Sequence, residues 1–357
     1  MFSRKSKKIL PFYCNVSGPT YSSIASNEGK EGNTRMTKPA LTLALLALTL
    51  PVAHTPANAQ ESGTATQALV SFDSKTPAAA TAKDVTIKVD NRITPLVNLA
   101  AVPPNGTQVA LLIDDGLRTS IGGELNNLKA FITSLPAGTE VFVGYMQNGA
   151  VAPATNAPGF TTDRAAAAEG LRMSMGIRGA SASPYFCLSD FVKNWPPSAE
   201  GQPGPQSRHF VHKARIVLMI TNGVDPYNGS TRITNQDSPY VNAAITDAQR
   251  AGVPVYSIYY TDAGFGPRRG SFSGQSYLQQ VAQGTGGSTY YLGTGNPVSL
   301  QPFLKQFQTA LAETYVATFP VDANKKMVSL KLSTTLPKTK VNAPNQVRPG
   351  TVVLSNQ

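Results

Sequence analysis

Two adjacent acids, Asp114 and Asp115, follow the apolar run VALLI at 109–113. An acid at the end of a buried strand can bind a cation, take part in acid/base chemistry or pair with a basic side chain. Neighbouring side chains at a strand end point apart, so we do not expect these two carboxyl groups to share a proton as a catalytic pair. The turn that they begin is instead a candidate for ligand binding.

Signatures of other chemistry are weak. Beyond residue 59 the only histidines are His209 and His212, in the segment HFVH near the start of an apolar run. Residues three apart on a strand point to opposite faces, so we do not expect them to share a metal. The segment GSFSG at 270–274 resembles a serine-hydrolase elbow but has Phe272 at the nucleophile position. These patterns argue against a metal centre at HFVH and against a hydrolase.

A glycine cluster at Gly284, Gly286 and Gly287 also invites a nucleotide-binding interpretation. These glycines follow a helical pattern and precede an apolar run, whereas a phosphate site needs glycines before a helix. We therefore interpret them as a turn, and expect the chain not to be an enzyme.

The elements around the acidic turn alternate between strand-like and helical patterns. A helix is predicted at 299–313 from apolar side chains spaced three and four apart, and another after Ser238-Pro239, which has the form of a cap followed by proline. Strand-like apolar runs occur at 109–114, 140–146, 215–221, 254–260 and 288–292.

Continuous apolar strands that alternate with helices are typical of a mostly parallel sheet covered on both faces. The predicted fold is therefore α/β, with a doubly wound, Rossmann-like sheet and a small accessory β segment built from both flanks. Ligands bind beyond the carboxyl ends of the strands in such sheets, which is where Asp114 lies.

The chain divides into five segments on this interpretation. The α/β domain spans 105–314. Short, partly alternating strands precede it at 81–104 and follow it at 315–357, and the Ala-, Thr- and Ser-rich stretch at 60–80 is expected to be a flexible lead-in. Residues 1–59 are a leader.

The leader contains a secretory signal pattern at 36–59. A basic start is followed by an apolar stretch from Ala40 to Ala53 and by the small-x-small end Ala57-Asn58-Ala59. The apolar stretch is shorter than the roughly 20 residues that span a bilayer, so we expect cleavage before Gln60, no stable membrane span, and an exported protein that is periplasmic or secreted. The 35 polar residues ahead of it suggest Met36 as the true start.

Charge and cysteine content limit the partners. The full chain has a formal net charge of +11; residues 1–59 carry seven Lys or Arg and two acids, so their removal leaves +6. The remaining basic residues form no dense run, and we do not expect nucleic-acid binding. Cys187 is the one cysteine beyond the leader and cannot form an internal disulfide. Trp195 is expected to anchor a helix in the core, with an exposed binding role as the alternative.

Three further segments, in their order and spacing, resemble the von Willebrand factor type A domain, and in particular its bacterial exported VWFA-related branch. They are IVLMITNG at 216–223, YLQQVAQGTGGSTYYL at 277–292 and ALAETYVATFP at 310–320. The resemblance covers nearly all of the chain beyond the leader and implies a protein-binding or adhesion-type module.

The family's metal-ion-dependent adhesion site can be compared position by position. Its turn reads Asp-x-Ser-x-Ser, and here Asp114 matches the acid, while Gly116 and Arg118 replace the two hydroxyls. Asn222 stands in place of the second acid, and Ser183 matches the loop threonine. The resemblance therefore implies a degenerate site.

A divalent cation needs several oxygen ligands in a defined geometry. Asp114, Ser183 and Asn222 would form at most a weak Mg or Ca site, so no cofactor is expected. For Arg118 two interpretations stay open: an exposed side chain beside a vestigial site, or a guanidinium that pairs with Asp114 or Asp115 in place of the cation.

The ligand-binding candidates are Asp114, Asp115, Gly116, Arg118, Ser183 and Asn222. The predicted function is non-enzymatic binding of an unidentified protein or envelope component through the loops at the carboxyl edge of the sheet. The alternatives are a metal-dependent adhesion module with altered ligands, and a structural component of an envelope assembly.

Overall fold

The computed structural model describes residues 63–74, 79–155, 159–177, 179–198, 210–225, 238–261, 271–293 and 295–356. These residues belong to one compact unit, Ala59–Gln357. The expected signal peptide, the proposed start at Met36, His209 and the side chain of Phe272 lie outside the described residues.

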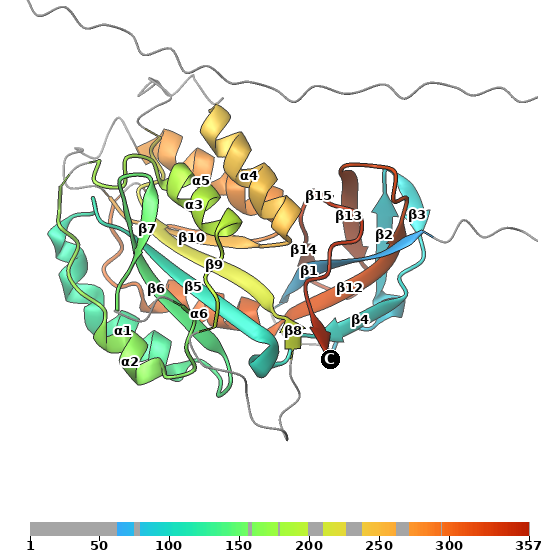
Figure 1. The fold of residues 1–357 in the computed structure, drawn as a ribbon, viewed down its shortest axis with the longest axis horizontal. Coiled ribbons are helices and arrows are strands. Elements are labelled where there is room, and N and C mark those ends of the chain that lie inside the picture. The colour runs from blue at the N-terminus through green and yellow to red at the C-terminus, as the bar shows by residue number, and fades with distance from the viewer. Residues whose placement is uncertain are drawn as a thin grey trace, which may run out of the picture. The chain divides into compact units, whose positions relative to one another are not determined.

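A six-stranded sheet with the order β11-β10-β9-β5-β6-β7 forms the centre (Figure 1). Neighbouring strands are parallel, except that β7 pairs antiparallel with β6 at one edge. The α/β class and the mostly parallel sheet are therefore confirmed. The strands of this sheet are β5 (Thr107–Asp114), β6 (Glu140–Gln147), β7 (Ala150–Pro153), β9 (Ala214–Thr221), β10 (Val255–Tyr259) and β11 (Thr289–Tyr290).

Helices pack on both faces of the central sheet, because the side chains of β5 alternate between two apolar clusters. Leu111 packs in a cluster with α1, α2 and α6, whereas Leu112 packs in a cluster with α3, α4 and α5. The helices are α1 (Leu125–Ser134), α2 (Arg164–Glu169), α3 (Pro184–Lys193), α4 (Pro239–Ala251), α5 (Ser271–Thr285) and α6 (Gln301–Ala312), with 3-10 turns η1 (Ala82–Asp84), η2 (Pro104–Gly106) and η3 (Thr119–Glu124).

The sequence located two of these helices well. The helix predicted at 299–313 is α6, and its apolar face places Leu304 and Phe307 in the core. Ser238 caps α4 by accepting a hydrogen bond from the backbone N–H of Val241, as the Ser-Pro pair predicted.

Beside the central sheet lie two four-stranded antiparallel sheets, ordered β14-β1-β12-β4 and β15-β13-β2-β3. Side chains from both sheets share one apolar cluster, so we call this part of the molecule the accessory sandwich. Its strands are β1 (Thr64–Ser74), β2 (Val85–Val89), β3 (Arg92–Thr94), β4 (Asn98–Ala101), β12 (Thr314–Val321), β13 (Val328–Thr334), β14 (Thr339–Asn342) and β15 (Gln346–Val347).

Strand β1 corrects the expected flexible lead-in at 60–80. Its composition is rich in Ala and Thr, yet Leu69, Val70 and Phe72 are all buried. The strand pairs along its length with β12, from Thr64 opposite Val321 to Ser71 opposite Thr314. The apolar side chains in the second half of this stretch therefore outweigh its low-complexity composition.

The end of the chain also differs from expectation. Short strands were expected within 315–357, but near the end of that segment only β16 (Ser355–Asn356) is a strand, and it pairs with β8 (Phe210–His212) at the edge of the α/β domain. Val353 is buried in the cluster that contains α1 and α6. The last residues thus return to the α/β domain.

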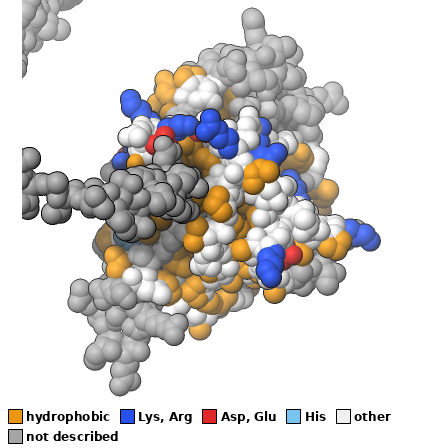
Figure 2. All heavy atoms as spheres, turned by 90° about the vertical axis from the view of Figure 1, so that its right-hand side faces the viewer, with side chains coloured by type: hydrophobic (Ala, Val, Ile, Leu, Met, Phe, Trp, Pro, Cys, Tyr) orange, Lys and Arg blue, Asp and Glu red, His pale blue; other side chains and the backbone are white. Residues whose placement is uncertain are grey.

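No helix among the described residues is long and apolar enough to cross a membrane. Figure 2 shows the side of the molecule where β2, β3 and β13 lie; in this view Lys and Arg side chains lie mainly across the upper part and toward the right, among apolar and uncharged side chains.

Candidate functional site

The acidic turn lies at the carboxyl end of β5, next to the carboxyl end of β9. Asp114 is the last residue of β5, and the neighbouring pair Ile113 and Ile220 place it beside Thr221, the last residue of β9. The next strand in the sequence, β6, lies on one side of β5 and β9 lies on the other, so the strand order reverses at β5. Ligand sites of α/β sheets form at such positions.

Asp114 is 3% exposed. Its Oδ1 accepts a hydrogen bond from the backbone N–H of Gly116 at 2.9 Å, and its Oδ2 accepts one from Oγ1 of Thr221 at 2.7 Å. Oγ1 of Thr221 also accepts a hydrogen bond from the backbone N–H of Gly223 at 3.2 Å. The carboxylate therefore joins the ends of β5 and β9, a link that the sequence did not reveal because threonine at a strand end is common.

Asp115 is fully buried and points to different partners, as expected for neighbouring residues. Its two oxygens accept two parallel hydrogen bonds from the guanidinium of Arg172, each 2.8 Å long. The backbone N–H of Met175 and the amide of Gln147 donate two more. A bidentate arginine is a strong partner for a carboxylate, so the negative charge of Asp115 is compensated within the protein.

The Arg172 side chain is itself held in place. Its guanidinium carbon lies 3.9 Å from the centre of the Tyr145 ring. The Tyr145 hydroxyl donates to the Arg172 carbonyl at 2.6 Å and accepts from its backbone N–H at 2.7 Å. The Tyr145 ring on β6 thus helps to orient the Arg172 guanidinium toward Asp115.

These contacts decide the pKa of Asp115. Burial alone would raise it, but the hydrogen bonds from Arg172, Met175 and Gln147 together outweigh burial and hold the pKa of Asp115 below its ordinary value. The carboxylate pairing in turn raises the pKa of Arg172. Both groups are therefore charged at neutral pH.

A built-in guanidinium does pair with Asp115, and it belongs to Arg172, 57 residues further along the chain. Arg118 follows the turn half-exposed, and its backbone N–H donates to the carbonyl of Thr261 at 3.2 Å. No sequence pattern marked Arg172, because its loop has neither the period of a strand nor that of a helix.

Gly116 occupies the position of the family's first hydroxyl, and the space around it is small. A Cβ atom there would lie 3.1 Å from the Ile177 carbonyl oxygen, 3.2 Å from Oδ1 of Asp114 and 3.3 Å from the Gly179 nitrogen. A serine at this position would therefore require the Asp114 side chain and the loop that carries Arg172 to shift by a few tenths of an ångström.

Ser183 and Asn222 lie at the same edge and are both buried. Ser183 caps α3, and its Oγ accepts from the N–H of Tyr185 at 3.3 Å. Oδ1 of Asn222 accepts from the N–H of Val224 at 2.8 Å. The oxygens that the resemblance offered as metal ligands therefore stabilise a helix start and a turn.

The charge of Asp114 affects two ionisable side chains in the first turns of α3. Burial raises the pKa of Cys187 to about 12, and the negative charge of Asp114 contributes to that rise. Burial likewise raises the pKa of Tyr185, with contributions from Asp225, Tyr277 and Asp114. The Tyr185 hydroxyl donates to the Gly223 carbonyl at 2.6 Å, which ties α3 to the turn after β9.

A third buried acid, Asp225, was missed by the sequence analysis. It is 2% exposed, and its Oδ2 accepts from Oγ of Ser238 at 2.5 Å. Its position three residues after Asn222 could have revealed it, because an acid so close to the end of a strand is expected to lie at the edge of the sheet. Ser238 therefore serves both as helix cap and as partner of a buried carboxyl group.

The described part of the chain contains no group of three or more His, Cys, Asp or Glu side chains arranged to hold a metal ion. Three apolar side chains at this edge are exposed beside the polar ones: Met173, Met175 and Ile177 are 52%, 53% and 60% exposed. They alternate along the loop that carries Arg172, while Ser174 between them is buried and donates to the Leu117 carbonyl at 2.9 Å.

Comparison with known proteins adds little to this geometry. No protein-family model matches the chain, and no curated protein matches it. Among solved structures, the crystal structure of the human COPII-coat protein Sec24c is similar with a TM-score of 0.35 and 9% identity, over 71% of this chain and 45% of that chain. The chain thus spans less than half the length of that protein, and a likeness of this size carries no argument about the site.

Proposed function

We propose that the chain is an exported, type A-like binding protein with a doubly wound α/β domain. It binds a protein partner through the turn at 114–118 and the loop at 171–177, without catalysis and without a metal ion. The export part of the proposal rests on the signal pattern at 36–59, and the type A part on the order of motifs in the sequence.

Independence from metal is supported by the way the buried acids are satisfied. Arg172 supplies the positive charge next to Asp115, and both oxygens of Asp114 accept hydrogen bonds from the protein. A divalent cation prefers several carboxylate and hydroxyl oxygens directed at one point. Here Gly116 stands where the type A resemblance expects a hydroxyl, and a Cβ there would lie 3.1–3.3 Å from its neighbours.

The observation that carries the proposal is the apolar ridge formed by Met173, Met175 and Ile177. Three exposed apolar side chains on one short loop are unusual outside interaction surfaces, and methionine adapts readily to the shape of a partner. The loop is fixed to the turn after β5 through Asp115. A rigid loop with exposed apolar side chains at a ligand-binding edge is suited to protein recognition.

Thermal unfolding tests the metal part of this proposal. The chain from Gln60 onward would be melted in chelator and then in millimolar Mg, Ca or Mn, for wild type and Asp114→Asn. A ligand at a hundred times its dissociation constant adds roughly 2.7 kcal/mol to the stability of the folded state. We expect no metal to shift either midpoint; a shift in wild type that Asp114→Asn abolishes would establish a metal-dependent module instead.

Partner capture tests the binding surface. Wild type, the triple variant Met173→Ser, Met175→Ser, Ile177→Ser, and the control Val298→Ser would be compared as bait for envelope proteins of the source cells, with and without chelator. Val298 is 98% exposed and serves as a matched apolar position. We expect the triple variant alone to lose its partner, by at least tenfold, and chelator to have no effect; equal capture by all three proteins would contradict the proposal.

A further inference from the structure

A pocket lies at the other end of the central strands from the acidic turn. It has a volume of about 490 Å3, within the range of small-molecule sites. Gln108 and Arg215, near the starts of β5 and β9, lie in its lining, as does Trp195 just after α3. Asp114 and Thr221 end the same two strands, so the pocket is separated from the acidic turn by the length of the sheet.

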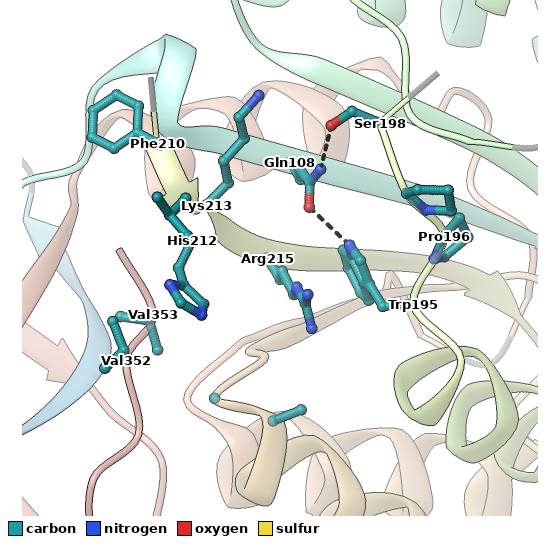
Figure 3. A pocket seen from close by; sticks show the side chains of 14 residues that line it. Gln108, Trp195, Pro196, Ser198, Phe210, His212, Lys213, Arg215, Val352 and Val353 are labelled. Atoms are coloured by element: carbon teal, nitrogen blue, oxygen red, sulfur yellow. Dashed lines mark hydrogen bonds between the residues drawn. The ribbon is translucent and has the colours of Figure 1, made fainter. Parts of the chain in front are cut away.

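The floor of the pocket is rigid. The Trp195 ring stacks on Phe160 with centroids 5.1 Å apart and meets Phe191 edge-on at the same distance. Its Nε1 donates to Oε1 of Gln108 at 2.8 Å, and Nε2 of Gln108 donates to Glu140 at 2.7 Å. Figure 3 shows the Trp195 and Gln108 bond at the edge of the open space.

The opposite wall comes from the end of the chain. Val352 and Val353 line the pocket, and β16 holds this segment against β8 through Ser355, whose Oγ lies 2.9 Å from Nδ1 of His212. In Figure 3 the side chains of Arg215 and His212 lie between this apolar wall and Trp195. The pocket therefore has a mostly polar, basic lining, with apolar contacts from Trp195 on one side and from Val352 and Val353 on the other.

The two cations of the lining differ in their environment. Lys213 forms an ion pair with Glu140, so its charge is compensated. The Arg215 guanidinium lies over the Trp195 ring, with its carbon 5.3 Å from the ring centre. None of the described residues that line the pocket is acidic. Arg215 is partly buried, and burial lowers its pKa.

We propose that this pocket binds a small organic anion, whose carboxylate or phosphate group meets the Arg215 guanidinium and whose apolar part lies between Trp195 and the Val352–Val353 wall. A planar guanidinium binds both anions through two parallel hydrogen bonds. An arginine that is already stacked on an aromatic ring loses little freedom when the anion binds.

The size and charge of the pocket favour a small molecule over a polymer. A nucleic acid requires a row of cations along a surface, whereas only one cation here lacks an acidic partner among the described residues. Trp195 and the Val352–Val353 pair offer apolar contact on two sides of Arg215, so a ligand with a short hydrocarbon beside its anionic group is expected to bind more tightly than inorganic phosphate alone.

Fluorescence offers a direct test, because Trp195 is the one tryptophan of the chain. Hexanoate, hexyl phosphate, hexanol and inorganic phosphate would each be titrated into the protein while the emission is recorded, with calorimetry as an independent readout. We expect saturable changes with hexanoate and hexyl phosphate. The two anions distinguish a carboxylate ligand from a phosphate ligand, and the neutral alcohol and inorganic phosphate should bind at least tenfold more weakly.

Variants complete the test. Arg215→Gln should weaken the anion at least tenfold while leaving hexanol unchanged, Arg215→Lys should fall between wild type and Arg215→Gln, and the control Arg92→Gln removes the same charge from an exposed position of β3. The comparison of hexanoate with hexanol needs no variant and remains valid if Arg215→Gln fails to fold.

Three results would overturn the inference. These are equal binding of hexanoate and hexanol, an unchanged affinity in folded Arg215→Gln, and the absence of any emission or heat signal with either organic anion at millimolar concentration.

Discussion

At the scale of single residues, the pair of Asp115 and Arg172 is the main stabilising contact of the carboxyl edge. The Asp115 side chain is 0% exposed, whereas that of Arg172 is 43% exposed. Removal of one member of such a pair leaves a buried charge without a partner. Loss of Arg172 should therefore destabilise the folded state, even though part of its side chain is exposed to solvent.

We predict that Arg172→Met lowers the free energy of unfolding by about 2 kcal/mol, less than for a fully buried pair because water still reaches this site. Urea denaturation measures it. The control Arg250→Met, which removes an exposed partner of Asp247 at 3.7 Å, should change it by less than about 0.5 kcal/mol. Asp115→Asn in the Arg172→Met background should restore part of the loss; simple additivity of the two changes would show that the pair is not coupled.

The lowered pKa of Asp115 predicts a pH dependence with a defined sign. A carboxyl group whose pKa is lower in the folded state binds fewer protons there than in the unfolded chain, so stability rises with pH. The contribution is present above the unfolded pKa of about 3.9 and is lost as the pH falls through the lower, folded value. The unfolding free energy of wild type should therefore fall more steeply between pH 5 and 3 than that of Asp115→Asn. Parallel curves would contradict the prediction.

Sequence reasoning could locate Asp114 and Asp115 because an acidic residue directly after an apolar run marks the end of a buried strand. It could not find Arg172 or Tyr145, whose contacts depend on how the loop after α2 folds back over β6. It also offered Ser183 and Asn222 as metal ligands, whereas both oxygens accept backbone N–H groups. Partner choice at such sites is a tertiary property that local patterns do not contain.

At the scale of elements, two glycines allow α5 to lie against the end of β9. Gly223 has φ +67°, and a Cβ there would lie 2.5 Å from Leu278 and 2.6 Å from the Gly274 carbonyl oxygen. A Cβ on Gly274 would lie 2.0 Å from the Asn222 carbonyl oxygen. The backbones of α5 and the turn after β9 therefore touch directly, which explains a glycine within a helix.

We predict that Gly274→Ala destabilises the fold by about 2 kcal/mol or more, because backbone must move to admit the methyl group. Alanine would otherwise favour a helix by about 1 kcal/mol. Gly284→Ala in the same helix is the matched control: its methyl group would meet only the flexible Ile245 side chain, at 2.8 Å, so little net change is expected. Thermal melts would show the contrast, and equal midpoints for both variants would refute the direct backbone contact.

Strands β5, β6, β9 and β10 of the central sheet were predictable because they are buried and form continuous apolar runs. The run at 288–292 contains β11, whereas the edge strand β7 was missed because its side chains are half-buried or exposed. Strand β1 was not predicted, because about half of it consists of Thr, Ala and Gln; its buried apolar residues and its pairing with β12 and β14 stabilise it. The position of the chain end against β8 was equally hidden. Only two residues form that strand.

At the scale of the whole molecule, Gln67 joins the accessory sandwich to the chain end. Its Oε1 accepts from the N–H groups of Val353 at 2.9 Å and Leu354 at 3.0 Å, and its own N–H donates to the Thr351 carbonyl at 2.8 Å. The Gln67 side chain thus positions the segment at 351–356, whose Val352 and Val353 line the pocket with Trp195 and Arg215.

We predict that Gln67→Leu lowers the free energy of unfolding by about 1–3 kcal/mol, because two backbone N–H groups lose their acceptor. Hydrogen exchange should show faster exchange at residues 351–356, and hexanoate binding should weaken in parallel. Gln346→Leu, at an exposed position of β15, is the control. Unchanged exchange in Gln67→Leu would show that β16 alone holds the segment.

The pairing of β1 with β12 also constrains the order in which the protein can fold. Thr64 finds its partner only once Val321 has been synthesised, so β1 waits, with apolar side chains exposed, until nearly the whole chain is present. Contacts between such distant segments form slowly. During that interval the apolar residues of β1 are a site for unwanted association.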